Sequence, residues 1–441
     1  MSSFDRASVI REVLVPLAAR GLILRRPRMV RRLARGDADR RAISRLEQLR
    51  TERGPEPLLL SVAGRRLAVV LDPDHARDVL ARTPDPFTPA TTEKRSALGR
   101  FEPHGVLISR RANRPLRREL NTAALDSGHA HHRLSTALNE AVDSTAVDLS
   151  RAGELDWTTF NARFQALARV LVLGPGAAAD TQLTDLLATL RADANWAYAS
   201  PLRRRKRRRL LARIGSYAGA PEDSLLSHLL SLSAAGDPDA HALEQVPHWL
   251  FAFDAAAIAS YTALALLALR PDDRAQALEE SDPTLPYLRA CVLETLRLWP
   301  TTPALLRDAT TDTELGETPI PKQTTLLIYP PLFHRDPRLE PDPDLFRPRR
   351  WLADGQVQDR PDTPVPLIPF SDKDARCPAQ ELVLAVTSRL LSGVLENAEL
   401  LSPQMGSYEA LVPGRPLPAT LDHQALRFRV SASTPQATIR S

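Results

Sequence analysis

One of the two cysteines, Cys377, stands where the residues around it could do metal chemistry. It precedes Pro378 and an amphipathic run with apolar residues at helical spacing, a pattern that predicts the start of a helix. Free backbone N–H groups and the positive end of the helix dipole favour the thiolate form of a cysteine there. A thiolate on a buried loop is a soft ligand for iron, including haem iron. The other interpretation is a buried structural cysteine, the usual state of a lone cysteine.

Three further charged residues fall within apolar segments, where a charge is costly unless it is paired or functional. Glu294 and Arg297 are three residues apart in LRACVLETLRLWP, a segment apolar enough to indicate a buried ion pair on one helix face. The alternative is a surface pair, which stabilises little. Asp254 lies in the middle of the mostly apolar run 239–269 and is a candidate functional acid.

The elements that must position these residues are mostly helices. The run 239–269 predicts a long helix at the centre of the protein, with Pro247 bending it near its beginning. Residues 285–299 and 155–174 predict two more helices. Charged residues 25–50 are expected to be helical, and a further helix is expected to begin at Pro73.

The β structure is expected to be small. Residues 57–73 predict a hairpin that turns near Ala63 and Gly64, and short strands are expected after Pro300 and in ALRFRV. Residues 83–108 predict a long loop. The chain has no internal repeat and no low-complexity linker, so we expect one mainly α domain over 1–441, with residues 1–50 as a helical extension.

The composition indicates which classes of protein and which cell compartment the chain fits. The 441 residues carry 58 Lys+Arg and 53 Asp+Glu, a net charge of +5, which is weak support for nucleic-acid binding. Only four residues are lysine, a bias typical of GC-rich bacterial genomes. Two cysteines make no disulfide framework, which fits a reducing cytoplasm. No apolar run reaches the roughly 20 residues of a membrane span, so we expect no transmembrane segment.

Three charged clusters each allow two interpretations. The arginines from Arg110 to Arg118 are either an anion site, for example for carboxylates, or a solvated face. The run Arg203 to Arg209 follows Trp196 and Tyr198 and is either a nucleic-acid or membrane patch or a solvated helix, which we favour. The three histidines at 129, 131 and 132 are either a metal site or surface residues, and we favour surface residues because no acid or cysteine is spaced with them.

The order of the motifs along the chain is more specific than any one of them. Glu294-x-x-Arg297 is followed by Phe346-x-Pro348-x-Arg350-Trp351, and then by Phe370 seven residues before Cys377. This order resembles the haem-thiolate monooxygenases of the cytochrome P450 superfamily, from about Pro57 to the C-terminus. The resemblance implies the single-domain cytochrome P450 fold and a haem b (iron protoporphyrin IX) cofactor.

The resemblance assigns a role to each matching residue. Cys377 would be the proximal ligand of the haem iron, with Phe370 preceding it in the haem loop. The helix 239–269 would cross the distal face, where Asp254 is the nearest acid. Two further sets of residues receive a role from the resemblance. Glu294, Arg297 and Arg350 would form a buried network that locks the haem loop, and Arg117, Arg307 and Arg376 would contact the haem propionates.

The sequence departs from the family's pattern at two places. Lys373 and Ala379 replace glycines of the haem loop, and Ala375 replaces a propionate contact that Arg376 could restore. In the distal helix, an alignment on Phe251-Ala252 places Ala255 and Ala256 where the family's acid and threonine are expected, and an alignment on Asp254 places Ala255 at the threonine. In both alignments the alcohol that assists proton delivery is missing.

The resemblance therefore implies a soluble, cytoplasmic bacterial oxidoreductase of the monooxygenase type. Its substrate would be a small molecule of specialised metabolism, and its electrons would come from a ferredoxin and ferredoxin reductase or a similar partner. The missing acid–alcohol pair predicts atypical chemistry, such as substrate-assisted oxidation, oxidative coupling or use of peroxide. Two alternatives stand beside it. One is a catalytically decayed homologue that serves as a scaffold or helper for a partner enzyme, and the other is a basic nucleic-acid-binding helical protein.

Overall fold

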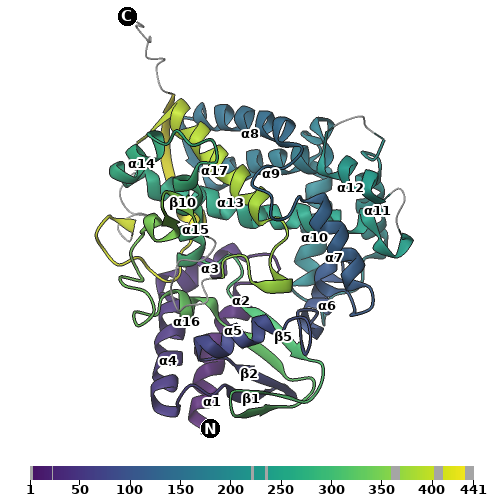
Figure 1. Cartoon of the computed structure of the whole chain (residues 1–441), viewed down its shortest axis with the longest axis vertical. Helices are drawn as coiled ribbons and strands as arrows, with labels where there is room; N and C mark the ends of the chain where they lie inside the picture. Colours follow the sequence, from purple (N-terminus) through teal and green to yellow (C-terminus); the bar gives the residue numbers. More distant parts are fainter. Residues whose placement is uncertain are drawn as a thin grey trace, which may run out of the picture.

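The computed structural model describes residues 3–21, 23–219, 223–233, 237–358, 368–401 and 411–432. Four long helices form the central bundle, in which α17 packs against α8, α13 and α15, and α13 packs against α9 (Figure 1). Their bounds are Ser135–Ser150 for α8, Trp157–Leu173 for α9, Val246–Ala268 for α13 and Gln380–Asn397 for α17. Helix α15, Pro286–Leu298, is buried along its whole length against this bundle.

Shorter helices surround the bundle. On one side lie α6, α7, α10, α11 and α12 (Figure 1), and α14 packs against α13, α15 and α17. Their bounds are Thr92–Leu98 for α6, Arg114–Ala124 for α7, Thr181–Ala194 for α10, Arg204–Gly215 for α11, Leu225–Ser233 for α12 and Pro271–Leu278 for α14. The helices of the β region are α1 Ser3–Val9, α2 Val15–Ala19, α3 Pro27–Arg35, α4 Ala38–Arg53, α5 Pro73–Ala81 and α16 Pro330–His334.

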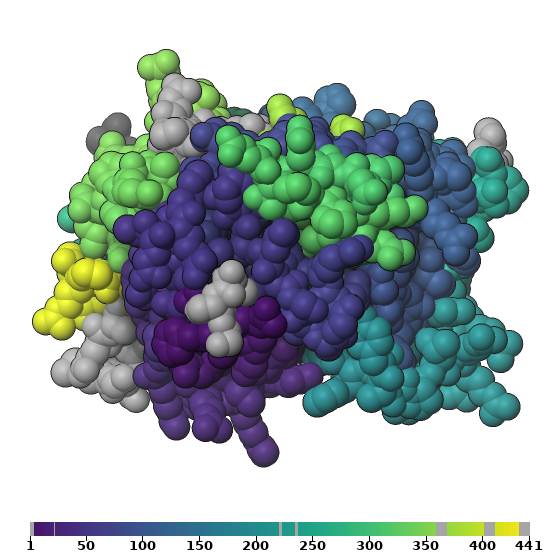
Figure 2. All heavy atoms as spheres, turned by 90° about the horizontal axis from the view of Figure 1, so that it is seen from below, coloured from purple at the N-terminus to yellow at the C-terminus, as the bar shows by residue number. Residues whose placement is uncertain are grey.

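The main sheet has five strands in the order β1-β2-β8-β5-β3. Strands β1 and β2 form the predicted hairpin, and Ala63 and Gly64 turn it with φ of 50° and 76°, the left-handed pair of a tight hairpin. The strands are β1 Leu58–Val62, β2 Arg65–Val69, β3 Phe87–Thr88, β5 Leu305–Ala309 and β8 Thr325–Ile328. Figure 2 shows N-terminal residues lying directly against green segments from the second half of the chain on one face.

Three smaller sheets complete the β region. Strand β12, Arg427–Ala432, pairs with β11, Ala398–Leu401, and with β4, Glu154–Asp156, which confirms the strand predicted in ALRFRV. The two-stranded sheets pair β6 Thr313–Leu315 with β7 Thr318–Ile320, and β9 Leu352–Ala353 with β10 Gln356–Val357. The fold is mainly α with a small β region, as predicted.

Several predicted boundaries were wrong. The central helix begins at Val246 and not at 239, because residues 238–244 form two 3-10 turns, and Pro247 occupies the first helical turn without bending it. The loop expected over 83–108 contains α6, which Thr91 caps by accepting from the N–H of Lys94. Residues 25–50 are mostly helical, as predicted, and form two helices, α3 and α4, separated at Asp37.

Among the described residues, α13 is the helix long and apolar enough to cross a membrane. Within its most apolar window, 72% of the residues are buried inside the protein, as in the core helix of a soluble protein. Of the predicted surface histidines, His132 is buried instead, because Leu134 N–H donates to its ring and its other nitrogen contacts the carbonyl of Ala124.

Candidate functional site

A backbone hydrogen bond closes the loop between Phe370 and Cys377, and this loop leads directly into α17. The N–H of Cys377 donates to the carbonyl of Phe370 at 2.8 Å, and a short 3-10 turn, Lys373–Ala375, lies between them. Lys373 has φ of 50°, so it adopts the left-handed conformation that a glycine would adopt with less strain. The loop therefore keeps a glycine-like backbone at the position where the family's glycine is absent. The proline-rich approach, residues 359–367, lies outside the described residues.

The thiol of Cys377 is subject to opposing effects. Burial raises its pKa above the ordinary value, while the N–H of Ala379 and the guanidinium groups of Arg118 and Arg376 act in the other direction. Burial is the larger effect, so the helix start alone does not ionise the thiol. A cationic metal would supply the remaining stabilisation of the thiolate.

Glu294 is the centre of a fully buried polar network. Arg297 Nε and Nη2 donate to its two carboxylate oxygens, both at 2.8 Å, and Arg350 Nε donates at 3.1 Å. Trp351 Nε1 and the N–H of Arg347 add bonds of 2.9 Å each. Burial would raise the pKa of Glu294, but Arg297 and Arg350 outweigh it and hold the pKa below its ordinary value.

The network reaches the segment that leads to the cysteine. Arg297 Nη1 donates to the carbonyl of His334 at 2.6 Å, and the ring of His334 accepts from the N–H of Ile368 at 3.3 Å. Burial and the neighbouring Arg297 lower the pKa of His334 to about 3, so its ring is neutral and can accept. The structure thus brings together Glu294, Arg297 and Arg350, and connects them to the haem loop.

A second group consists of three cations, of which Lys94 is influenced by the charges of Asp308 and Glu93, and Arg114 by that of Asp374. Arg307 is 2% exposed, and its Nε donates to Thr83 Oγ1 at 3.1 Å and its Nη2 to Ser371 Oγ at 3.4 Å. Lys94 lies beside it, and Arg114, 8% exposed, donates to the carbonyls of Val106 and Asp374. Within the described part of the chain, none of the three forms an ion pair with a carboxylate. We name Lys94, Arg114 and Arg307 the cation group.

The pKa values of the cation group reflect the closeness of its positive charges to one another. Burial and then Arg307 lower the pKa of Lys94 to about 7, and burial and then Arg114 lower the pKa of Arg307 to about 10. Buried like charges destabilise a protein unless an anion joins them. Two carboxylates, such as those of a haem, match this group.

The other predicted residues are placed as follows. Arg117 donates to the carbonyl of Asp239 at 3.1 Å and to Ser109 Oγ at 2.8 Å, so it is not part of the cation group, and Arg114 on the preceding turn reaches the haem loop instead. Arg376 Nε donates to Gln380 Oε1 at 2.9 Å.

Asp254 is engaged by neighbouring helices. Its carboxylate accepts from Gln165 on α9 at 2.6 Å and pairs with Arg191 on α10 at 2.5 Å. On the same helix Ala252, Ala255 and Ile258 are half-buried at helical spacing, although most of α13 is buried. These apolar residues form a partly open stripe on the central helix, and Asp254 beside them is half-buried too.

Sequence reasoning missed the role of Lys94. One signal was available, since Lys94 is one of four lysines in a chain rich in arginine. The anion site predicted among Arg110 to Arg118 matches Arg114, but the consecutive arginines did not indicate which one would be buried. Together, the thiol at the start of α17, the cation group and the apolar stripe fit a haem.

Residues 241–401 match the family model of cytochrome P450. The chain is 35% identical over 133 residues to "Probable cytochrome P450 4d21" of Drosophila melanogaster, covering 30% of this chain and 26% of that protein. It is 33% identical over 127 residues to "Cytochrome P450 705A22" of Arabidopsis thaliana, covering 28% and 25%. The aligned part thus spans about a quarter of the length of these curated relatives.

Two solved structures share the fold over most of its length. The crystal structure of a cytochrome P450 (CYP102L1) superposes with a TM-score of 0.70 at 17% identity, covering 89% of this chain and 94% of that one. The retinoic acid-bound cyanobacterial CYP120A1 gives a TM-score of 0.68 at 19% identity, covering 88% and 94%. Residues 241–401 thus resemble the cytochrome P450 family in sequence, and the chain shares the fold of these two cytochrome P450 structures; the family match and the fold imply a haem cofactor.

Proposed function

We propose that this protein is a haem-thiolate monooxygenase that oxidises a small molecule, with Cys377 as the proximal ligand. The observation that carries the proposal is the placement of Cys377 at the start of α17, in a loop whose Ser371 contacts Arg307 of the cation group. Thiol and cations are the two features that a haem-thiolate site requires from a protein. Haem b, when bound, supplies oxygen activation promoted by electron donation from the thiolate.

The chain's own residues would hold the cofactor and the loop. Arg307, Arg114 and Lys94 would bind the propionates, since the three cations have no carboxylate partner in the described residues. Glu294, Arg297 and Arg350 would keep the loop in place through His334 and Ile368. Phe370 would fix the cysteine by accepting its N–H.

Proton delivery is the proposed departure from the usual chemistry. Monooxygenation joins one oxygen atom to the substrate and reduces the other to water with two electrons and two protons. Ala255 and Ala256 cannot relay protons, and the contacts of Asp254 with Arg191 and Gln165 support a structural role for that carboxylate. The protons would come from substrate groups or water, or peroxide would serve as the oxidant and bring both electrons and protons.

The proposed electron donor is a ferredoxin with its reductase, and the proposed location is the cytoplasm. Arg110 and Lys373 are exposed beside the haem loop and its cationic neighbours, and an acidic partner would be steered to them. Arg114, from the same arginine cluster as Arg110, is buried and belongs to the cation group instead. A substrate from specialised metabolism remains the proposed class.

A scaffold role for a decayed homologue is the second candidate, favoured by the left-handed φ of Lys373 and the raised pKa of Cys377. The purified protein separates the two. A monooxygenase should be red and, when reduced under carbon monoxide, should show the strongly red-shifted Soret band of thiolate ligation. Cys377→Ala should lose this band, whereas the control Cys291→Ala, at the other buried cysteine, should keep it. A colourless protein that haemin cannot reconstitute would establish the scaffold instead.

A further inference from the structure

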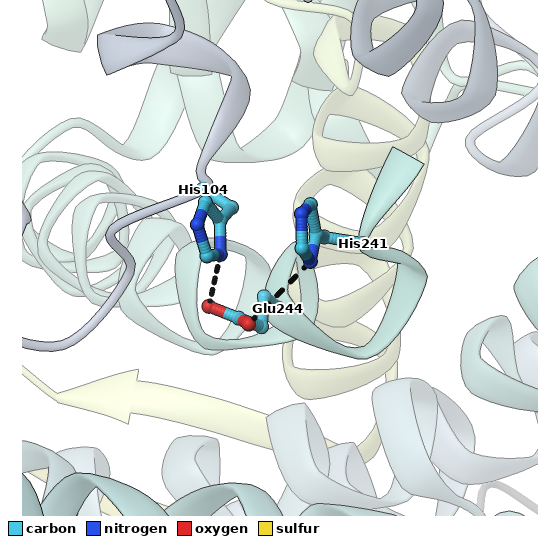
Figure 3. A group of neighbouring side chains, drawn as sticks. All are labelled: His104, His241 and Glu244. Carbon is cyan, nitrogen blue, oxygen red and sulfur yellow. Dashed lines mark ion pairs between the residues drawn. The ribbon is translucent and has the colours of Figure 1, made fainter. Parts of the chain in front are cut away.

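Two histidines and a glutamate from distant parts of the chain meet beside the start of α13 (Figure 3). His104 Nδ1 lies 2.9 Å from Glu244 Oε2, and His241 Nδ1 lies 3.7 Å from Glu244 Oε1. The two imidazole rings stack with centroids 3.8 Å apart and an angle of 11° between their planes. Figure 3 shows a nitrogen of each ring directed to the same side, toward the carboxylate. One potential ligand atom from each residue lies within 4.8 Å of the other two.

The backbone around this cluster is held in place. His241 has φ of 48° between two 3-10 turns, Pro238–Ala240 and Ala242–Glu244. Gln245, 1% exposed, donates from one amide nitrogen to the carbonyls of His104 at 2.9 Å and His241 at 3.3 Å. This amide therefore ties together the two segments that carry the histidines.

The three side chains are available as ligands. His104 Nδ1 is shielded from solvent and makes no hydrogen bond of good geometry within the described residues, although a carboxylate oxygen is 2.9 Å away. The ring of His241 is partly exposed. The charged groups facing this ring are Glu244 and Asp239, which favour a cation, and Arg117, which opposes one.

We infer that His104, His241 and Glu244 form a site for a divalent transition-metal ion of the zinc type. Two imidazole nitrogens and a carboxylate oxygen are a common donor set for zinc, and three protein ligands leave a fourth position for water. Zinc–ligand bonds of about 2.0–2.1 Å place tetrahedral ligand atoms roughly 3.3 Å apart, so the side chains must draw together by about 1.5 Å at most. All three are partly exposed and can turn.

Metal binding would join the loop before α7 to the start of the central helix. His104 precedes Val106 by two residues, and the carbonyl of Val106 accepts from Arg114 of the cation group at 3.1 Å. Bound metal would therefore hold more rigidly the backbone segment that contains Val106, the residue that accepts the hydrogen bond from Arg114. This site is separate from Cys377, and its metal binding does not depend on the proposed oxidation.

Isothermal titration of the full-length haem-containing protein, stripped of other metals with a chelator, tests the inference with zinc chloride as the probe. We expect one zinc per chain, and at least about a tenfold loss of affinity in His104→Ala, His241→Asn and Glu244→Gln. Asparagine tolerates the left-handed backbone at 241, so this variant should melt like the parent. Exposed His129 and His131 supply matched controls, and their alanine variants should bind zinc like the parent.

A thermal shift gives a second readout. Zinc should raise the Tm of the parent and of the two control variants, and should leave the Tm of His241→Asn unchanged. Absence of one-site binding in the parent, or equal zinc affinity in the parent and all three ligand variants, would overturn the inference. In that case the cluster is a hydrogen-bonded histidine–glutamate group.

Discussion

Lys94 and Arg307 donate to the same backbone carbonyl oxygen. The ammonium of Lys94 lies 3.2 Å from the carbonyl oxygen of Leu306, and Arg307 Nη1 lies 3.0 Å from it. Two cations sharing one neutral acceptor repel each other; Asp308 and Glu93 offset this repulsion in part at Lys94, and a further anion would relieve it. We therefore expect the haem propionates to bind beside these two cations.

Removing Lys94 should have opposite effects on the two forms of the protein. In Lys94→Met we expect the haem-free protein to be as stable as the parent or more so, because a crowded cation is lost. We expect haem to dissociate several-fold faster from the same variant, because a propionate partner is lost. Denaturant melts of the haem-free form and haem transfer to apomyoglobin measure the two effects. If Lys94→Met retained haem as well as the parent does, Lys94 would not be a propionate partner.

The stability of the haem-free protein should also depend on pH through Lys94. Its folded pKa of about 7 lies below the ordinary 10.5, so between these values the unfolded chain binds more protons. Stability should therefore rise as the pH rises from about 7 to about 10.5. The rise attributable to Lys94 is the difference between parent and Lys94→Met melts over this range, and bound haem should abolish that difference. Parallel curves for the two haem-free proteins would contradict this assignment.

Substitutions at Arg114 and Arg117 should have different effects on haem retention. Arg114→Gln should weaken haem retention, because Arg114 belongs to the cation group and contacts the haem loop at Asp374. Arg117→Gln should retain haem with an unchanged spectrum and lower the Tm, because its bonds go to Ser109 and Asp239. Haem content per chain and thermal melts distinguish the two. If Arg117→Gln lost haem and Arg114→Gln kept it, Arg117 would be the propionate contact, as the family resemblance implies.

Glu294 should be structural and not catalytic. Removing one member of a buried charge network costs about 3–5 kcal/mol, so Glu294→Ala should give haem-free or insoluble protein. Exposed Glu119 on α7 supplies the matched control, and Glu119→Ala should melt like the parent. Because the folded pKa of Glu294 is lowered, its contribution is present above the unfolded pKa and is lost as the pH falls through the folded one. A Glu294→Ala protein that keeps haem and melts normally would refute the network.

Asp254 and Arg191 should behave as a pair. Asp254→Asn and Arg191→Gln should each lower the Tm, and the double variant should lose less than the sum of the two single losses. Turnover with ferredoxin and oxygen should fall no more than turnover with added peroxide. A selective loss of the oxygen-dependent reaction in Asp254→Asn would instead assign the proton-delivering role to that carboxylate.

Reversing the exposed charges beside the haem loop should slow reduction by ferredoxin. Arg110→Glu with Lys373→Glu should lower the reduction rate at low salt, and the difference from the parent should shrink as salt screens the charges. Charge reversal at two exposed arginines of α11, Arg204 and Arg208, is the matched control and should leave the rate unchanged. A rate indifferent to both salt and the first pair of changes would exclude this docking face.

Local spacing explains why much of the site was predictable. Glu294 and Arg297 lie on adjacent turns of one helix, and the helix start after Cys377 follows from Pro378 and the apolar stripe. Positions that depend on long-range packing were not predictable. Lys94 reaches Leu306 only because α6 interrupts the expected loop, and the orientation of Asp254 depends on where α9 and α10 pack. The cluster of His104 with His241 combines residues far apart in sequence, which no motif records.

The five-stranded sheet determines which way Arg307 points. Arg307 stands opposite Leu326 of β8, and β8 is aligned in turn by β2 of the N-terminal hairpin, where Leu67 stands opposite Thr325. Because side chains alternate along a strand, a slip of β5 by one residue would turn this arginine to the opposite face of the sheet. A hairpin more than two hundred residues away in the chain thus helps to set the direction of a side chain that we propose binds the cofactor, so its alignment would be a condition for assembling the proposed haem site.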